Sequence, residues 1–183
     1  MLKYIFITLS LYLLNISCLF RPGPCPRIKL ENDTFLENNY MGKWYEVART
    51  KNDTVRTGSC VEENYTLTPD GTINTTITEY TNNGLSKIKG RMSPTRNPFV
   101  FNGSWVSSNG SLHGHHIVVY STDYNSFAVE YSCTNVLGGR NEYVFIKFRR
   151  KNYDEDTLEE LMDNIEEKMD ISKDLLDMTR KNC

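Results

Sequence analysis

Residues 60–84 read CVEENYTLTPDGTINTTITEYTNNG and contain two strand-like runs, each followed by a turn signal. The runs are rich in Thr, Tyr, Ile and Val, which are residue types that favour extended backbone. Pro69-Asp70-Gly71 and Asn82-Asn83-Gly84 supply residues that tolerate the dihedral angles of tight turns. The segment therefore predicts two neighbouring antiparallel strands with short connections.

Turn signals of the same kind recur at intervals of about ten residues as far as Asn141. An up-and-down series of eight hairpin-linked strands closes into a barrel, which removes exposed sheet edges and leaves room for one small ligand. The predicted fold class is therefore mostly β, an eight-stranded antiparallel up-and-down β-barrel. Its strands are expected near residues 43–49, 60–67, 72–81, 85–92, 99–106, 115–122, 127–134 and 142–150.

Beyond residue 150 the apolar positions change from alternation to the period of a helix. Acidic side chains fill the opposite face, so one C-terminal α-helix should pack on the barrel with a single buried face. Asp156 followed by Glu159 resembles a capping box, which places the start of the helix near Asp156. The apolar stripe consists of Leu158, Leu161, Met162, Ile165 and Met169.

The N-terminal segment contains one basic residue, Lys3, followed by an apolar run that is too short to span a bilayer. We expect residues 1–18 to be a secretory signal peptide and residues 19–183 to form one extracellular domain. No transmembrane segment is expected. The formal net charge of −2 does not indicate a nucleic-acid partner or an anionic membrane surface.

An even number of cysteines remains after removal of the signal peptide, which predicts two disulfides in a secreted protein. Their spacing leaves every pairing open. Cleavage after Ser17 would instead retain Cys18 as an additional thiol. The four expected disulfide cysteines are Cys25, Cys60, Cys133 and Cys183.

The Asn-x-Ser/Thr pattern of N-glycosylation occurs at Asn32, Asn52, Asn64, Asn74, Asn102 and Asn109. A glycosylated asparagine on a strand must point outward, and an unmodified one is also expected at the surface. Because strand neighbours alternate between faces, these positions indicate which side chains point into the barrel. The predicted inward set is Glu63, Tyr65, Leu67, Ile73, Thr75, Ile77, Glu79, Phe99, Phe101 and Trp105.

Three short motifs occur in chain order and resemble those of one known family. The segment Gly42 to Arg49, GKWYEVAR, is similar to the first lipocalin motif, and Thr122-Asp123-Tyr124 is similar to the second. The arginine that ends the last strand is matched by Arg149 or Arg150. Within the family, the likeness is to the apolipoprotein D and insect bilin-binding group. It rests on Cys25-Pro26, Gly58-Ser59-Cys60, Tyr131-Ser132-Cys133 and Cys183.

The resemblance implies that Cys25 pairs with Cys133 and Cys60 with Cys183. It also implies that Trp44 closes the barrel base, with Arg149 stacked on its ring in a cation–π contact. Alternation along the last strand then places Tyr143, Phe145 and Lys147 inside, and Val144, Ile146 and Phe148 outside against the helix. The predicted ligand cup is lined by Tyr65, Ile77, Phe101, Trp105, Tyr131 and Phe145.

Glu79 and Lys147 are charged exceptions in this apolar cup. They could form a buried pair, recognise the polar head of a ligand, or lie near the wet mouth of the barrel. The mouth is favoured because an unpaired buried charge is costly. The loop over residues 51–59 is polar and joins two strands across the mouth, so we expect it to form a mobile lid.

These observations predict a secreted carrier of one small hydrophobic molecule, such as a lipid, steroid, retinoid or bilin-type pigment, with no other cofactor. The alternative is a glycosylated extracellular interaction or scavenger module that acts through its loops. The sequence leaves open which ligand is carried and how many chains assemble.

An enzyme is not expected, because no Ser-His-Asp set or phosphate-binding glycine loop is evident. A lipid isomerase occurs among lipocalins and uses a free thiol, which here would require the loss of one disulfide. His113, His115 and His116 could suggest a metal site, but alternation turns His116 away from the other two. No metal site is therefore predicted.

Overall fold

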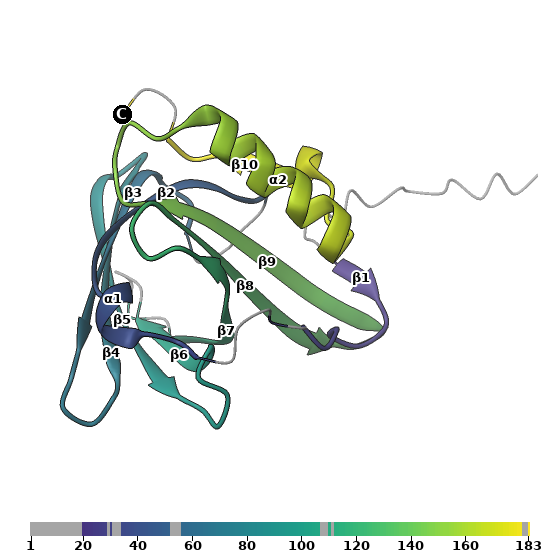
Figure 1. Ribbon diagram of the computed structural model, residues 1–183, viewed down its shortest axis with the longest axis horizontal. Coiled ribbons are helices and arrows are strands. Elements are labelled where there is room, and N and C mark those ends of the chain that lie inside the picture. Colours follow the sequence, from purple (N-terminus) through teal and green to yellow (C-terminus); the bar gives the residue numbers. More distant parts are fainter. Residues whose placement is uncertain are drawn as a thin grey trace, which may run out of the picture.

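The computed structural model describes residues 20–28, 30, 34–51, 56–106, 110, 112–180 and 183. Eight antiparallel strands, β2 to β9, follow one another in hairpins, and β9 also pairs with β2, so the sheet closes into a barrel (Figure 1). The predicted fold class is confirmed. The barrel strands are β2 Gly42–Thr50, β3 Ser59–Leu67, β4 Ile73–Thr81, β5 Gly84–Pro94, β6 Val100–Val106, β7 Leu112–Thr122, β8 Phe127–Val136 and β9 Gly139–Phe148.

Four short elements were not predicted, because segments of three or four residues carry no usable periodicity. Strand β1, Phe20–Pro22, pairs with β9, and β10, Leu176–Met178, pairs with β2. Helix α1, Glu37–Tyr40, precedes β2, and the 3-10 helix η1, Lys173–Leu175, precedes β10. These elements lie on the outside and at one end of the barrel, and the pairing of β2 with β9 still closes it.

The last barrel strand is shifted from its predicted bounds. It begins at Gly139, directly after a turn in which Gly138 has a φ of +82°, and it ends at Phe148. Gly138 permits a tight reversal, so β8 and β9 pair as far as Val136 opposite Gly139. Arg149 therefore follows the strand instead of ending it.

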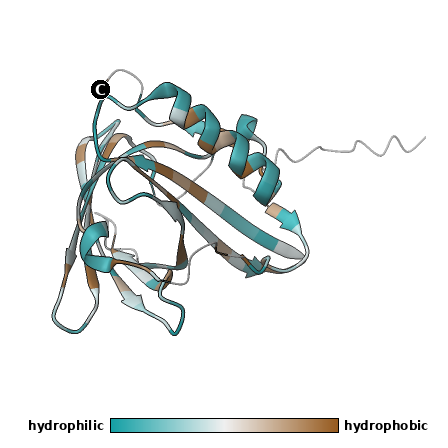
Figure 2. Ribbon diagram, viewed as in Figure 1, coloured by the Kyte–Doolittle hydropathy of each residue, from teal (hydrophilic) through white to brown (hydrophobic). Residues whose placement is uncertain are grey.

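Helix α2, Glu155–Met169, lies across the outside of β8 and β9 (Figure 1). Its N-cap is Asp154, whose carboxylate accepts a hydrogen bond from the Thr157 amide at 3.0 Å. The predicted capping box at Asp156 is therefore wrong by two positions, and the run of three acids explains the error. Figure 2 shows the alternation of hydrophobic and hydrophilic positions along the strands and the mainly hydrophilic outer surface of α2.

Two hydrophobic clusters hold the domain together. One lies inside the barrel and includes Trp44 and Phe101. The other lies between the barrel and α2, where Val144, Ile146 and Phe148 meet the helix residues Leu158, Leu161 and Ile165. The alternation along β9 is therefore as predicted, and each face of this strand contributes to a different cluster.

The cysteines form the disulfides Cys25–Cys133 and Cys60–Cys183, the pairing that the family resemblance implies. Each one ties a terminal segment to a barrel strand. Asn64, Asn74 and Asn102 are exposed on the outer face of the barrel. Residues 1–18, Asn32, Asn52 and Asn109 lie outside the described residues. None of the described helices has the length and apolar character needed to cross a membrane.

Candidate ligand-binding site

The barrel base is closed by Trp44, which is fully buried. Its indole nitrogen donates to the carbonyl of Tyr40 at 2.9 Å, and the guanidinium carbon of Arg149 lies 3.7 Å from the centroid of its ring. Arg149 also donates to three backbone carbonyls, those of Asn39, Lys43 and Tyr124, at 2.7–3.0 Å. The stack therefore joins α1, β2 and the turn before β8.

The turn between β7 and β8 is organised by Asp123. Its Oδ1 accepts hydrogen bonds from the amides of Asn125, Ser126 and Phe127 at 2.8–3.1 Å. The next residue, Tyr124, adopts a left-handed conformation with a φ of +66°. This geometry aims the Tyr124 carbonyl at Arg149, which gives the Thr122-Asp123-Tyr124 motif a positioning role.

An interior cavity lies in the barrel between the base and the mouth. Its volume is about 30 Å³, well below the roughly 300–1,000 Å³ of sites that hold drug-sized ligands. An occupant of that size must therefore displace side chains. The cavity is lined by Arg56, Ile77, Trp105, His115, Ile117, Ser132, Tyr143 and Phe145.

Trp105 lies on the inner wall where two glycines leave room for its ring. A Cβ on Gly103 would lie 1.9 Å from Cη2 of Trp105, and a Cβ on Gly90 would lie 2.3 Å from Cδ1. Gly90 is the cross-strand partner of Trp105, and Gly103 is two residues before it on β6. The missing Cβ atoms therefore allow the indole to lie against the wall instead of filling the cavity.

Two polar atoms on the cavity wall have no hydrogen-bond partner among the described residues. They are Nε1 of Trp105 and Oγ of Ser132, and both side chains are more than nine-tenths buried. Buried polar groups are normally paired, so unpaired ones at a cavity are available to an occupant. An indole NH can only donate, whereas a hydroxyl can donate and accept.

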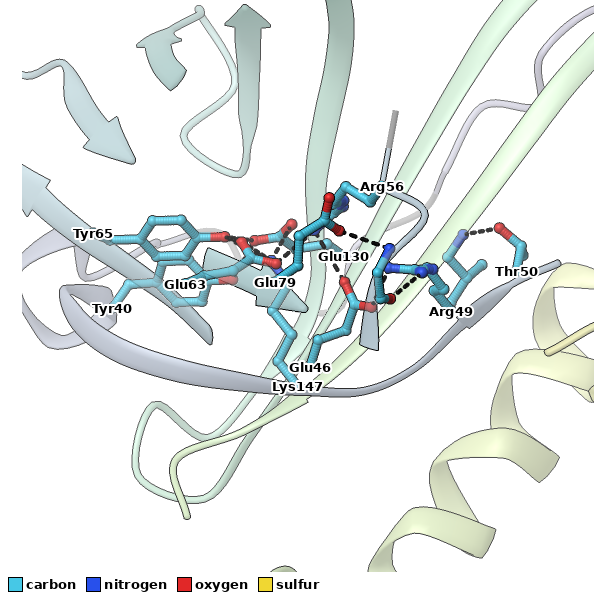
Figure 3. Close-up of polar contacts among 12 residues, drawn as sticks. Tyr40, Glu46, Arg49, Thr50, Arg56, Glu63, Tyr65, Glu79, Glu130 and Lys147 are labelled. Atoms are coloured by element: carbon cyan, nitrogen blue, oxygen red, sulfur yellow. Dashed lines mark hydrogen bonds and ion pairs between the residues drawn. The ribbon is translucent and has the colours of Figure 1, made fainter. Parts of the chain in front are cut away.

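Below the cavity, Lys147 is fully buried at the centre of a charged network (Figure 3). Its ammonium lies 2.8 Å from Glu63 and 2.7 Å from Glu130, and it donates to the Tyr65 hydroxyl at 2.6 Å. The Tyr65 hydroxyl in turn donates to Glu63. The Tyr40 hydroxyl donates to Glu130 at 2.7 Å.

The charges in this network offset the cost of burial. Burial by itself would raise the pKa of Glu63, but the positive charges of Lys147 and Arg56 outweigh it and lower that pKa to about 2. Burial raises the pKa values of Tyr40 and Tyr65, and the neighbouring Glu130 raises them further. Both tyrosines therefore remain neutral hydrogen-bond donors.

A second group of charges lies next to the cavity. Arg56 donates to Glu63 at 2.5 Å and to Glu46 at 3.1 Å, and Arg49 contacts Glu46 at 3.0 Å. The guanidinium carbon of Arg56 lies 3.6 Å from the centroid of the Phe145 ring. Burial raises the pKa of Glu46, against the opposing effect of Arg56 and Arg49.

The placement of Lys147 corrects the expectation that it lies at the wet mouth, and Glu79 is buried as well. Lys147 forms buried ion pairs with Glu63 and Glu130, and Glu79 is only 3% exposed. The Gly58 amide donates to Oε2 of Glu79 at 3.0 Å. Sequence alternation placed both side chains inside but could not identify partners on other strands or in the loop.

Five of the six predicted cup residues lie inside the barrel, and three of these line the cavity. Ile77, Trp105 and Phe145 line the cavity. Tyr65 and Phe101 are inside the barrel but contact aromatic residues away from the cavity, Tyr40 and Phe35 respectively.

The expected inward position of Tyr131 is wrong. Its ring packs in the cluster between the barrel and α2, and its hydroxyl donates to Glu142 at 2.6 Å. Alternation itself contained the signal, because Tyr131 and Cys133 share a face of β8 and Cys133 bonds to Cys25 outside the barrel. Ser132 therefore faces the cavity instead.

The predicted lid loop is only partly described, because residues 52–55 lie outside the described residues. Its remaining part is anchored by contacts. Lys51 donates to the carbonyl of Asp174 at 2.6 Å, and Arg49 donates to the carbonyl of Gly58 at 2.6 Å. The most consequential residue that sequence reasoning missed is Arg56, since no periodicity indicates that a loop arginine enters the barrel.

The histidines do not form a metal site in the described part of the chain. His116 is exposed, whereas His113 and His115 are half-buried. Among the residues that the structure describes, no group of three His, Cys, Asp or Glu side chains could hold a metal ion. His115 instead lines the cavity, with its ring 6.2 Å from that of Trp105 and 5.7 Å from that of Tyr143.

A closed antiparallel barrel around an interior cavity is an architecture of small-molecule-binding proteins. Residues 41–181 match the model of the Lipocalin / cytosolic fatty-acid binding protein family. The chain belongs to the lipocalin family, whose members are binding proteins for small hydrophobic molecules.

Relatives in sequence and structure agree with this assignment. The chain is 28% identical to apolipoprotein D of Bos taurus over 68% of its own length and 70% of that protein. It is 32% identical to the outer membrane lipoprotein Blc of Vibrio cholerae over 91% and 92% of the two chains. Insecticyanin from the tobacco hornworm Manduca sexta has the same fold, with a TM-score of 0.73, 19% identity and 88% of each chain covered.

Proposed function

We propose that the protein is a secreted carrier that binds one small hydrophobic molecule inside its barrel. The observation that carries the proposal is the cavity wall formed by Ile77, Trp105, Ile117 and Phe145. An apolar wall with a few polar atoms is typical of small-molecule sites. Trp105 Nε1 and Ser132 Oγ supply such atoms, and neither has a partner among the described residues.

Transport outside the cell is supported by covalent features. Two disulfides persist in oxidising compartments and are uncommon in the cytosol. Asn64, Asn74 and Asn102 are exposed on the barrel and are available for glycans. We infer that residues 1–18 are removed on export, which N-terminal sequencing of protein secreted by expressing cells would test.

Tryptophan emission tests the carrier function directly, because the chain has two tryptophans and only Trp105 lines the cavity. We expect at least one compound in a panel of retinoids, steroids, fatty acids and tetrapyrroles to quench emission in a saturable manner. The Trp105→Phe variant should lose this quenching and retain the emission of Trp44 at the base. If no compound gives a saturable signal by fluorescence or calorimetry, the alternative of an interaction module that acts through its loops replaces the carrier function.

A further inference from the structure

The barrel interior contains more negative than positive charges among its described residues. Four buried carboxylates face three buried cations, which leaves one negative charge in excess when all are ionised. Because an unpaired carboxylate in a low-dielectric interior is costly, this interior favours a positively charged occupant over a neutral or negative one. The groups are Glu46, Glu63, Glu79 and Glu130, with Arg49, Arg56 and Lys147.

Arg56 differs from the other two cations in where it is attached. Arg49 is on β2 and Lys147 is on β9, so each is held by the sheet. Arg56 lies in the loop before β3, which begins at Ser59. Its side chain can therefore leave the barrel without the loss of a strand pairing.

The surroundings of the Arg56 guanidinium are suited to an organic cation. The face of Phe145 lies on one side, with its centroid 3.6 Å from the guanidinium carbon. The carboxylates of Glu63 and Glu46 accept its hydrogen bonds at 2.5 and 3.1 Å. An aromatic face together with carboxylates attracts a positive charge through cation–π and charge-assisted hydrogen bonds.

An apolar wall continues from this cation position. Arg56 shares the cavity lining with Ile77, Ile117 and Trp105, and the cavity measures only about 30 Å³ while the guanidinium is present. A larger ligand gains both volume and two carboxylate partners if it displaces Arg56. An anionic ligand would instead meet the four carboxylates, because Lys147 and Arg56 are already engaged in ion pairs.

We propose that the ligand is an apolar molecule with a protonated amine, and that Arg56 occupies the position which this amine takes. The proposal rests on the carrier function and adds the chemical class of the ligand. Arg56 then acts as an internal competitor, and its removal both opens the cavity and leaves the carboxylates of Glu46 and Glu63 available to the amine.

Three probes with one aromatic skeleton test the proposal: 2-phenylethylammonium, 2-phenylethanol and 3-phenylpropionate. Each is titrated by calorimetry at low salt and neutral pH into the parent protein, Arg56→Ala and Arg56→Gln. We expect Arg56→Ala to bind the ammonium probe about tenfold more tightly than the alcohol, and more tightly than the parent does. Arg56→Gln removes the charge but keeps a long side chain, so it should show the same preference if the alanine variant fails to fold.

Lys87→Ala is the matched control, because Lys87 is exposed on β5 and its loss also removes one positive charge. This variant should bind all three probes as the parent does. Equal binding of the ammonium and alcohol probes by both Arg56 variants, or a preference for the carboxylate probe, would overturn the proposal. The panel of retinoids, steroids, fatty acids and tetrapyrroles separates the proposed ligand class from the proposed carrier function. If a compound of the panel binds and the ammonium preference is absent, only the ligand class is wrong. If no compound binds, the carrier function is wrong as well.

Discussion

The guanidinium of Arg149 lies over the indole of Trp44, 3.7 Å from the ring centroid, and donates to carbonyls of three separate segments. These contacts join the turn before β8 to α1 and to the start of β2. The base of the barrel is thus closed by Arg149, which follows β9, and by Trp44 on β2.

Removal of this closure should destabilise the whole barrel. Arg149→Ala loses a cation–π contact and three charge-assisted hydrogen bonds, so we expect the free energy of unfolding to fall by about 2 kcal/mol in urea titrations. Arg149→Lys should recover only part of this loss, because an ammonium cannot reproduce the planar guanidinium fork. Arg150→Ala changes an exposed neighbour and should have an effect within about 0.5 kcal/mol. Equal effects at Arg149 and Arg150 would contradict the structural role.

Glu63 should make the stability of the fold dependent on acid pH. Burial is outweighed by Lys147 and Arg56, so its pKa in the folded state is about 2, below the ordinary value of about 4.3. Its ionised form therefore stabilises the fold above the ordinary pKa, and this contribution is lost as the pH falls from about 5 towards 2. Glu63→Gln should lower the free energy of unfolding by about 3 kcal/mol at neutral pH, because Lys147 and Arg56 lose a partner.

The same variant should also flatten the acid limb of the stability curve, measured by urea unfolding at several pH values. Glu160→Gln, which changes an exposed carboxylate on α2, should leave that limb unchanged. If Glu63→Gln and the parent lose stability in parallel below about pH 5, the contribution assigned to Glu63 is wrong.

Ligand affinity should depend on the two glycines, Gly90 and Gly103, that leave room for the ring of Trp105. The Cβ of Gly103→Ala would lie 1.9 Å from the indole, so the ring must move towards the cavity. We expect at least about a tenfold loss of affinity for any ligand that quenches Trp105, because the displaced ring occupies ligand volume. In Gly114→Ala the new Cβ makes its nearest contact at 3.7 Å, so binding should be unchanged. Unaltered affinity in a folded Gly103→Ala protein would show that the ligand lies elsewhere.

Each disulfide closes a long loop, with its cysteines separated by 108 and 123 residues. In the chain-entropy model each bond contributes about 4–5 kcal/mol. The double variants Cys25→Ser with Cys133→Ser, and Cys60→Ser with Cys183→Ser, should both melt well below the parent in calorimetry. Non-reducing peptide mapping checks the pairing, and a linked Cys25–Cys60 peptide would refute it.

Local sequence patterns predicted most of the barrel because its strands are encoded by alternation and its connections by turn residues. The exposed positions of Asn64, Asn74 and Asn102 then oriented neighbouring side chains, so that Ile77 and Trp105 were correctly placed inside. The prediction failed at Tyr131. Cys133 lies two residues further along the same strand and faces outward, so alternation from Cys133 would have placed Tyr131 outside as well. The prediction also failed at the start of α2, where neighbouring acids offered several possible caps.

By itself, then, the sequence determined the number and succession of the barrel strands, the amphipathic helix and, through family motifs, the stack of Arg149 on Trp44. Only the tertiary structure decided that Lys147 pairs with Glu63 and Glu130, and that Arg56 enters the barrel and lies on Phe145. The physical reason is that alternation assigns a side chain to a face. Partners inside a closed barrel depend on the register of distant strands and on the path of a loop, neither of which has a local period.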